Sequence, residues 1–331
     1  MTVPAPWIAA QARQLLAQRG HAWLLQGPSG LGQYGLAMSL VAGWLCDHPT
    51  PDGACGQCSS CHTFAARAHT DLCVLMPETI MLELGWPLSE KAQDEIDSKK
   101  RKPSKEIRVE AMRDAVEFAQ RTSGRGRGKA VLVYPAERMN PITANALLKT
   151  LEEPAGDLRF VLASEASHQL LPTIRSRCLG HTMAWPREAE ALAWLAEEGV
   201  KSADAPALLR AAGMRPDDAL AAFRAGRTSG SWASLPKALA RGDGSMLAGW
   251  SPSEAVAALQ KLCHDMLAVQ SGAPPRFFQA ADLPPVAGYP ALAGWAEALW
   301  RTARTVEHPF NAGLMLEALV SQARSALNSR P

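Results

Sequence analysis

A glycine-rich turn that directly follows a short apolar run constrains this chain more than any other feature. Residues 22–26 read Ala-Trp-Leu-Leu-Gln, which predicts a buried strand, and the turn after them places Gly27 and Gly32 five positions apart. This is the glycine spacing of a loop that holds phosphate with backbone N–H groups ahead of a helix. Residues 34–46 follow with one apolar face at helical spacing. We therefore expect a parallel α/β sheet with this loop at the carboxyl end of its first strand.

The two positions after Gly32 lack the residues that bind a triphosphate. A phosphate-binding loop continues with Lys, which reaches the β- and γ-phosphates, and then Ser or Thr, whose hydroxyl ligates magnesium. Here these positions hold Gln33 and Tyr34. A neutral amide forgoes a charge-assisted contact worth roughly 1.5–3 kcal/mol, and a phenol ring is too bulky to replace a small hydroxyl beside a six-coordinate ion. Gly27, Gly32, Gln33 and Tyr34 therefore form a degenerate loop, for which we expect no bound ATP.

The second half of such a site is also missing. A phosphate-loop ATPase carries an acidic pair at the end of another strand, where it holds magnesium and positions water. The candidate strand, residues 130–133, is followed by Tyr134 and Pro135 where the acids are expected. Glu137 is the nearest acid, and we expect it to lie beyond the strand end in solvent. Two independent losses predict that the chain has no intrinsic ATPase activity.

Composition indicates a globular protein of more than one domain. The 331 residues suggest two or three domains, and a hydrophobic content of 47% excludes a disordered chain. With 34 basic and 32 acidic residues the formal net charge is +2, so any nucleic-acid contact has to be local. No apolar run has the roughly eighteen residues of a membrane span, and no signal-peptide pattern occurs. We expect a soluble, cytoplasmic protein.

The remaining sequence pattern separates an α/β part from a helical part. Further strands are predicted at 71–76, 130–134 and 160–163. A helix is predicted over 107–121, and another, with Asn140 as its cap and Pro141 in its first turn, runs to 153. Beyond about residue 186 the pattern predicts helices at 187–198, 203–212 and 215–225, a linker at 226–231 and further helices to 331. The polar segment 78–105 is expected to be a surface excursion.

Four cysteines predict a metal site. Cys55, Cys58 and Cys61 are spaced by two residues each, and Cys46 precedes them by eight intervening residues. Such spacing lets the thiolates converge on one ion, and four of them complete a closed, structural zinc site with no position left for substrate. The triplet also matches the start of a bacterial ferredoxin run, which needs a fourth cysteine at position 65, where this chain has alanine. Unrelated buried thiols are the remaining alternative.

Two further motifs complete a recognisable order. Residues 145–154 read Asn-Ala-Leu-Leu-Lys-Thr-Leu-Glu-Glu-Pro, and residues 176–178 read Ser-Arg-Cys. Together with the glycine loop and the cysteines, this order resembles the AAA+ clamp-loader subunits of bacterial DNA polymerase III. That family divides into ATP-hydrolysing gamma/tau subunits and delta-prime subunits with a degenerate nucleotide site, and the residues at 33, 34, 134 and 135 match the second group. The resemblance is rich in motifs over 20–185 and rests on helical character beyond.

The resemblance implies a domain plan, partners and one functional residue. It implies an AAA+ core (1–185) with a zinc-binding module inserted at 46–61, a helical lid (186–226) and a collar for oligomerisation (227–331). The partners would be gamma/tau and delta subunits, with the sliding clamp and primed DNA reached through the complex. Arg177 would act in trans as an arginine finger at a neighbour's ATP, an effect worth about 10³–10⁵ in rate. From the residues alone, an arginine at this position is more often solvated or salt-bridged.

Other interpretations stay open at this point. The chain could be a catalytically active gamma/tau-type ATPase or a zinc-containing DNA-binding module. Two basic segments, 99–102 and 121–129, fit either solvated loops or contacts with DNA phosphate.

Overall fold

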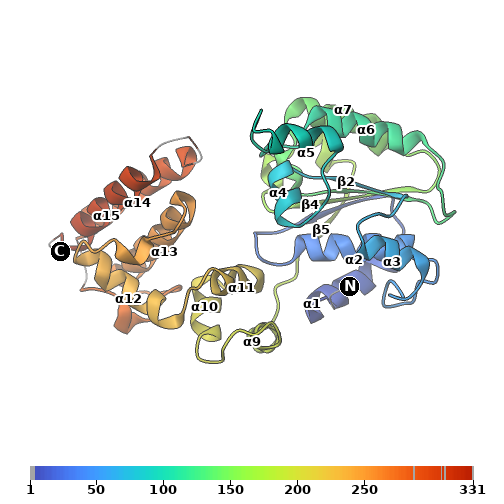
Figure 1. Cartoon of the computed structure of the whole chain (residues 1–331). Helices are drawn as coiled ribbons and strands as arrows, with labels where there is room; N and C mark the ends of the chain where they lie inside the picture. Colours follow the sequence, from blue (N-terminus) through green and yellow to red (C-terminus); the bar gives the residue numbers. More distant parts are fainter. Residues whose placement is uncertain (1–3, 286–287, 307, 309–310, 330–331) are drawn as a thin grey trace. The chain divides into compact units, whose positions relative to one another are not determined.

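The chain folds into two compact units, Met1–Pro186 and Arg187–Pro331. The structure is a computed structural model that describes residues 4–285, 288–306, 308 and 311–329 (Figure 1). Within these residues, none of the helices combines the length and the apolar character needed to cross a membrane.

A parallel sheet forms the centre of the first unit, as the sequence predicts. Its strands are β1 (Ala22–Gln26), β2 (Leu72–Leu75), β3 (Lys129–Val133), β4 (Leu158–Ser164) and β5 (Leu179–Thr182). Their order is β2-β3-β4-β1-β5, and all four pairings are parallel. Because β1 lies between β4 and the edge strand β5, the glycine loop leaves the carboxyl end of an internal strand, where α/β sheets bind ligands.

Strand β5 is the one strand in the described residues that the sequence pattern did not predict. It lies at the edge of the sheet, and three of its four residues are exposed. An edge strand of this kind needs no continuous apolar run, so periodicity gives no signal for it.

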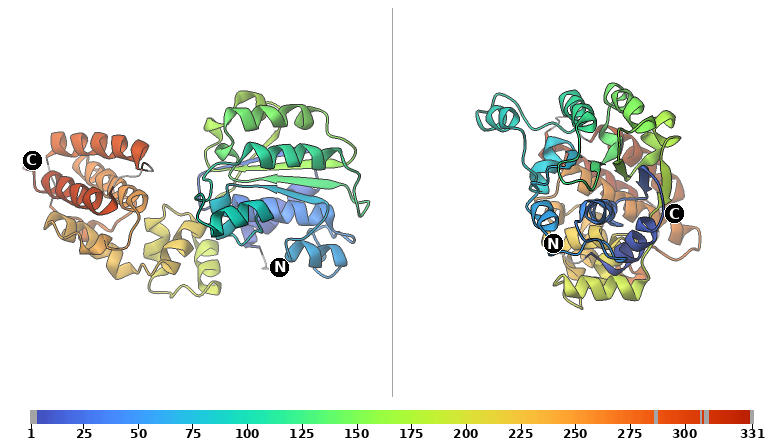
Figure 2. Two further views of the ribbon diagram at one scale, coloured as in Figure 1. Left: turned by 45° about the horizontal axis from the view of Figure 1, so that its top comes forward. Right: turned by 90° about the vertical axis from the view of Figure 1, so that its right-hand side faces the viewer.

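Helices cover both faces of this sheet (Figure 2). In the views of Figures 1 and 2, α6 and α7 lie on one face and α1 and α2 on the other. The α-helices of the unit are α1 (Pro6–Leu16), α2 (Gln33–Leu45), α3 (Ser59–Ala65), α4 (Glu78–Glu83), α5 (Glu90–Asp97), α6 (Val109–Gln120), α7 (Pro141–Glu152) and α8 (Pro172–Arg175). Asn140 caps α7 through a hydrogen bond from the Thr143 N–H to its side chain, and Pro141 is the first helical residue, as predicted.

The segment 78–105 lies at the surface between β2 and α6, as predicted, and it contains regular structure. It contains α4 and α5, and the nearly buried carboxylate of Glu78 accepts hydrogen bonds from Arg101 Nη1 (2.5 Å), Arg101 Nη2 (2.8 Å) and the Ser104 N–H (2.8 Å). Burial alone would raise the pKa of Glu78, but these donors and Arg108 lower it overall. An internal ion pair therefore organises part of this surface segment, a contact that its polar composition did not predict.

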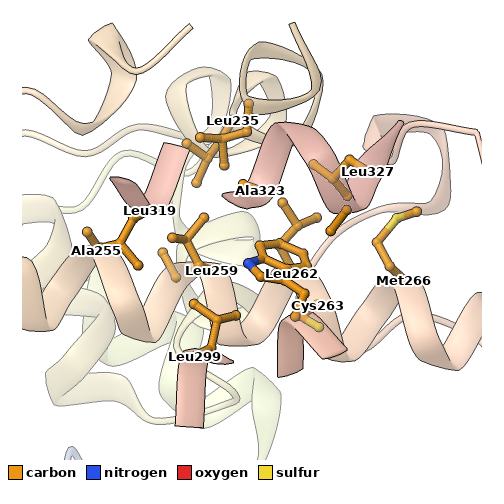
Figure 3. Packing of buried hydrophobic residues seen from close by; sticks show 14 of the residues in the cluster. Leu235, Ala255, Leu259, Leu262, Cys263, Met266, Leu299, Leu319, Ala323 and Leu327 are labelled. Carbon is orange, nitrogen blue, oxygen red and sulfur yellow. The ribbon is translucent and has the colours of Figure 1, made fainter. Parts of the chain in front are cut away.

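The second unit is helical throughout and contains two apolar cores. Helices α9 (Glu188–Glu197), α10 (Ala205–Ala211) and α11 (Pro216–Arg224) share one cluster of buried residues. The second cluster lies among α12 (Ser229–Ala240), α13 (Pro252–Gln270), α14 (Tyr289–Thr305) and α15 (Ala312–Leu327). Figure 3 shows Leu259 and Leu262 of α13 among side chains of the other helices of this cluster, including Leu235, Leu299 and Ala323.

The predicted linker at 226–231 is only partly correct. Helix α12 begins at Ser229, because the Thr228 and Ser231 side chains form a reciprocal capping box with each other's backbone N–H groups. The Gly/Ser composition that predicted a linker is here the start signal of a helix.

Candidate functional site

The glycine loop joins β1 to α2 with the backbone geometry of a phosphate-binding turn. Gly30 and Gly32 have φ angles of 76° and 88°, which favour glycine, and Gly32 is the N-cap of α2. A Cβ atom at Gly27 would lie 3.0 Å from Met183 Cβ, so this position also fits glycine best. The scaffold of the loop is therefore preserved down to the glycines that shape it.

The side chain of Gln33 forms hydrogen bonds with the backbone of this loop. Its side chain is buried, and Nε2 donates hydrogen bonds to the carbonyl oxygens of Gly27 (2.9 Å) and Pro28 (2.6 Å). A lysine at this position would direct a charged group at a bound phosphate. The amide instead satisfies carbonyl groups of the loop itself, which stabilises the loop without a ligand.

Tyr34 and Tyr134, which stand at the two halves of the degenerate site, contact each other. Their ring centroids are 5.2 Å apart with the planes inclined by 33°. The Tyr34 hydroxyl accepts a hydrogen bond from Trp86 Nε1 (2.8 Å), and the Tyr134 hydroxyl donates to Glu165 Oε1 (3.0 Å). Burial raises the pKa of Tyr34, so its phenol stays neutral at ordinary pH. An aromatic contact thus occupies the positions where a magnesium ligand and an acid are expected.

Glu137 is not solvated, contrary to the expectation from sequence. It is half-buried, and its carboxylate accepts hydrogen bonds from Ser164 Oγ (2.7 Å) and from the Glu165 N–H (3.1 Å). The acid nearest in sequence to the end of β3 is therefore engaged at the end of β4, where it holds the chain as it leaves the sheet.

The four cysteines converge as the spacing predicts. All four sulfur atoms lie within 4.8 Å of one another. Sγ–Sγ distances are 3.5 Å for Cys46–Cys55, 3.8 Å for Cys46–Cys58, 3.7 Å for Cys46–Cys61 and 3.9 Å for Cys55–Cys61. A tetrahedral zinc ion with Zn–S bonds of about 2.3 Å requires sulfur atoms about 3.8 Å apart. The donor set and its geometry fit one tetrahedral ion, whereas ligands to a multi-iron cluster lie farther apart.

Local structure explains how the chain brings these sulfurs together. Cys46 is the residue that ends α2, Cys58 is the N-cap of α3, and Cys61 lies in the first turn of α3. The Cys61 N–H donates to Cys58 Sγ (3.4 Å), and the Cys55 N–H donates to Cys46 Sγ (3.3 Å). Backbone N–H groups of Gln57 and Cys58 lower the pKa of Cys55 to about 6, whereas burial raises that of Cys61 to about 12. Metal binding would require that all four lose their protons.

A polar network ties this cluster to the loop between α6 and β3. Asp47, which follows the first cysteine, accepts from the Ser60 N–H (3.2 Å) and from Arg125 Nη2 (3.2 Å). The buried carboxylate of Asp71 accepts from the Gly124 N–H (2.7 Å) and the Arg125 N–H (2.9 Å). The cysteine segment and this loop therefore hold each other in place.

The two basic segments carry fewer free charges than their sequences suggest. In 121–129, Arg121 and Arg125 pair with carboxylates, and Lys129 donates to the carbonyl oxygens of Phe118 and Ala119 at the end of α6. In 99–102, Arg101 pairs with Glu78 and Glu95. Segment 121–129 is thus largely engaged in internal contacts, which favours its interpretation as a structured loop. Segment 99–102 keeps three exposed lysines, at positions 99, 100 and 102.

Arg177 follows α8 and lies against the end of α7. Its Nε and Nη2 atoms both contact Glu152 Oε1, and Nη1 donates to the Thr173 carbonyl oxygen (2.8 Å). The side chains of Arg177 and Glu152 are 32% and 45% exposed, so this ion pair lies at the surface. The arginine predicted as a functional residue is therefore partly exposed and is held by contacts within its own chain. No sequence pattern predicts the contact with Glu152, because 25 residues separate the two.

The chain matches known proteins over its first half. A family model described as DNA polymerase III, delta subunit, matches residues 10–184. The chain is 42% identical over 193 residues to the DNA polymerase III subunit delta' of Pseudomonas aeruginosa, an alignment of 58% of this chain and 52% of that protein. It is 35% identical over 225 residues to subunit delta' of Escherichia coli, covering 66% and 60%.

The matched regions span between half and three fifths of those relatives. Among solved structures, a gamma subunit-related protein of Thermotoga maritima aligns with a TM-score of 0.48 at 15% identity, covering 97% of this chain and 99% of that one. The family model alone covers more than half of the chain, which therefore belongs to the DNA polymerase III delta subunit family.

Proposed function

We propose that this chain is a non-catalytic subunit of the DNA polymerase III clamp loader, which helps to load the sliding clamp onto primed DNA. One observation carries this proposal: the glycine loop is intact, but Gln33 and the Tyr34–Tyr134 contact fill the positions that bind a triphosphate and magnesium. A scaffold of this kind can still pack beside similar subunits. Its relatives named subunit delta' support the same assignment.

The chain would contribute to ATP hydrolysis only at the site of a neighbour. Arg177 is the residue proposed for this role, since a surface guanidinium can stabilise charge that develops on the γ-phosphoryl oxygens of another subunit's ATP. Its partial exposure after α8 is compatible with such a contact. Gamma/tau and delta subunits are the proposed partners, and the complex would work in the cytoplasm.

The cysteine cluster would hold a structural zinc ion. Cys46, Cys55, Cys58 and Cys61 would supply four thiolates, and a closed coordination shell leaves no position for a substrate. Zinc would thereby fix the end of α2 to the start of α3.

The proposed domain plan follows the distribution of the apolar cores. Residues 1–185 would form the AAA+ core, 186–226 the lid and 227–331 the collar. Two clusters of buried residues in the second unit support a division into lid and collar, although Ala211 of the proposed lid packs in the second cluster.

Replacement of the proposed finger tests the function directly. Arg177→Ala, assembled with gamma/tau and delta subunits, is expected to form the complex but to lower its ATP hydrolysis by about 10³-fold at the site that the finger serves. Steady-state hydrolysis and clamp loading measure this effect. Arg175→Ala is the matched control, because that neighbouring arginine is also exposed. Wild-type rates for Arg177→Ala would exclude the finger assignment.

The isolated chain separates this proposal from the alternatives. We expect neither ATP binding in equilibrium dialysis nor hydrolysis. Magnesium-dependent hydrolysis would indicate a gamma/tau-type ATPase instead. Tight, strongly salt-dependent binding of the isolated chain to DNA would indicate a DNA-binding module.

A further inference from the structure

The ion pair with Glu152 engages the guanidinium group of Arg177, which is the group that would act in the proposed arginine finger. We infer that Glu152 is a positioning residue that holds Arg177 on its own subunit, and that the triphosphate of a neighbouring subunit must displace this carboxylate before the finger can act. This inference rests on the proposed role of Arg177 and adds a regulatory partner to it.

The geometry leaves no guanidinium nitrogen unengaged. Nε and Nη2 both face Glu152 Oε1, while Nη1 donates to the Thr173 carbonyl oxygen (2.8 Å) and lies 3.4 Å from Ser176 Oγ. The Nε/Nη2 edge is one of the planar forks with which arginine binds carboxylate or phosphate through two parallel N–H groups. The Glu152 carboxylate therefore binds the same pair of N–H groups that would bind a phosphate.

Among the residues that the structure describes, Glu152 is the single carboxylate positioned to compete with a phosphate for Arg177. It is the last residue of α7, and the helix fixes the carboxylate next to the segment that carries Arg177. Glu153, the next residue, is equally acidic and exposed but is not paired with Arg177. The two adjacent glutamates thus differ in one relevant contact, which makes Glu153 a matched control.

The expected effect is small because the pair is exposed. A surface ion pair biases the position of its side chains by about two- to fivefold. If the arginine can act only when it is released from its ion pair, the observed rate of hydrolysis is the full rate multiplied by the fraction of molecules in which it is released. Removal of the Glu152 charge should therefore raise the rate of hydrolysis about two- to fivefold, and the effect should shrink as salt screens the wild-type pair.

Glu152→Gln in the assembled complex tests the inference, because it keeps the shape of the side chain and removes its charge. Single-turnover ATP hydrolysis is measured without clamp and DNA at 50 and 500 mM potassium chloride. We expect about two- to fivefold faster hydrolysis at the lower salt concentration, a smaller difference at the higher one, and no change in Glu153→Gln. Co-elution of all subunits verifies assembly of each variant.

Two results would overturn the inference. Glu152→Gln could hydrolyse ATP at or below the wild-type rate, which would mean that Glu152 does not restrain the finger. It could also accelerate hydrolysis equally in an Arg177→Ala background, which would mean that it acts through another residue. If Arg177→Ala itself has no effect, the proposed function fails; if only Arg177→Ala lowers the rate, the function stands and this inference alone fails.

Discussion

The glycine loop and the cysteine cluster are two ligand-binding motifs in the first unit, and they differ in what their functional side chains contact. At the glycine loop, the side chains that replace the expected ligand-binding residues bind each other or the loop itself, as Gln33 does with two carbonyl groups. At the cysteine cluster, four sulfurs face one another at separations that suit a metal ion. A binding motif thus keeps a geometry that could hold a ligand only where its functional side chains still point at a common centre.

This contrast has a physical basis in how polar groups are satisfied. A buried amide or hydroxyl needs a hydrogen-bond partner, and Gln33 and Tyr34 find theirs within the protein. Thiols are weak hydrogen-bond donors and acceptors, so a cluster of four gains little from mutual contacts. Zinc coordination would supply the missing stabilisation.

Removal of a cysteine ligand should produce the largest effect. Cys58→Ser is expected to reduce bound zinc from one ion per chain to none and to lower the melting temperature, because metal binding contributes directly to folding in such modules. Atomic absorption and thermal unfolding measure both. Treatment of the wild type with a strong chelator should reproduce the loss.

Cys73→Ser is the control, since Cys73 lies in β2 and outside the cluster. Retention of zinc by Cys58→Ser, or its loss from Cys73→Ser, would contradict the proposed ligand set. Brown protein with iron in place of zinc would support the ferredoxin alternative instead.

Loss of the aromatic contact at the glycine loop should have an intermediate effect. Tyr34→Ser removes both the ring contact with Tyr134 and the hydrogen bond from Trp86, so we expect a loss of about 2 kcal/mol in the free energy of unfolding. Tyr34→Phe keeps the ring and should lose about 1 kcal/mol. Denaturant unfolding of the two variants separates these contributions. An unchanged free energy of unfolding in Tyr34→Ser would show that the contact between Tyr34 and Tyr134 does not stabilise the loop.

The smallest effect is expected at the edge of the cysteine cluster. Asp47→Asn removes the charge that Arg125 contacts, and should increase proteolytic cleavage within 121–128 without loss of metal. Arg125 lowers the pKa of Asp47, so this contact holds at neutral pH and is lost only as the pH falls below the ordinary range of an aspartate. Asp52→Asn, at the exposed pair with Arg13, is the matched control. Equal cleavage in both variants would contradict a link between cluster and loop.

Sequence patterns predicted the fold well where burial was regular. β1 was predicted residue for residue, and the helix capped by Asn140 begins as expected, because capping and apolar runs are local signals. Strand β5 and the start of α12 were missed, since an exposed edge strand and a Ser/Thr cap lack an apolar period. Glu137 was placed in solvent because its partner Ser164 is 27 residues away.

The amino-acid sequence established which chemical groups are present: no cation directly follows Gly32, no acid directly follows β3, and four thiols have metal-binding spacing. What those groups contact became known only from the folded structure. Gln33 binds its own loop, Tyr34 meets Tyr134 across the sheet edge, and Arg177 rests on Glu152. Residue identity and short-range spacing are local properties, whereas the contacts of Tyr34 and Arg177 join segments that are distant in the sequence and meet only in the folded sheet and its helices.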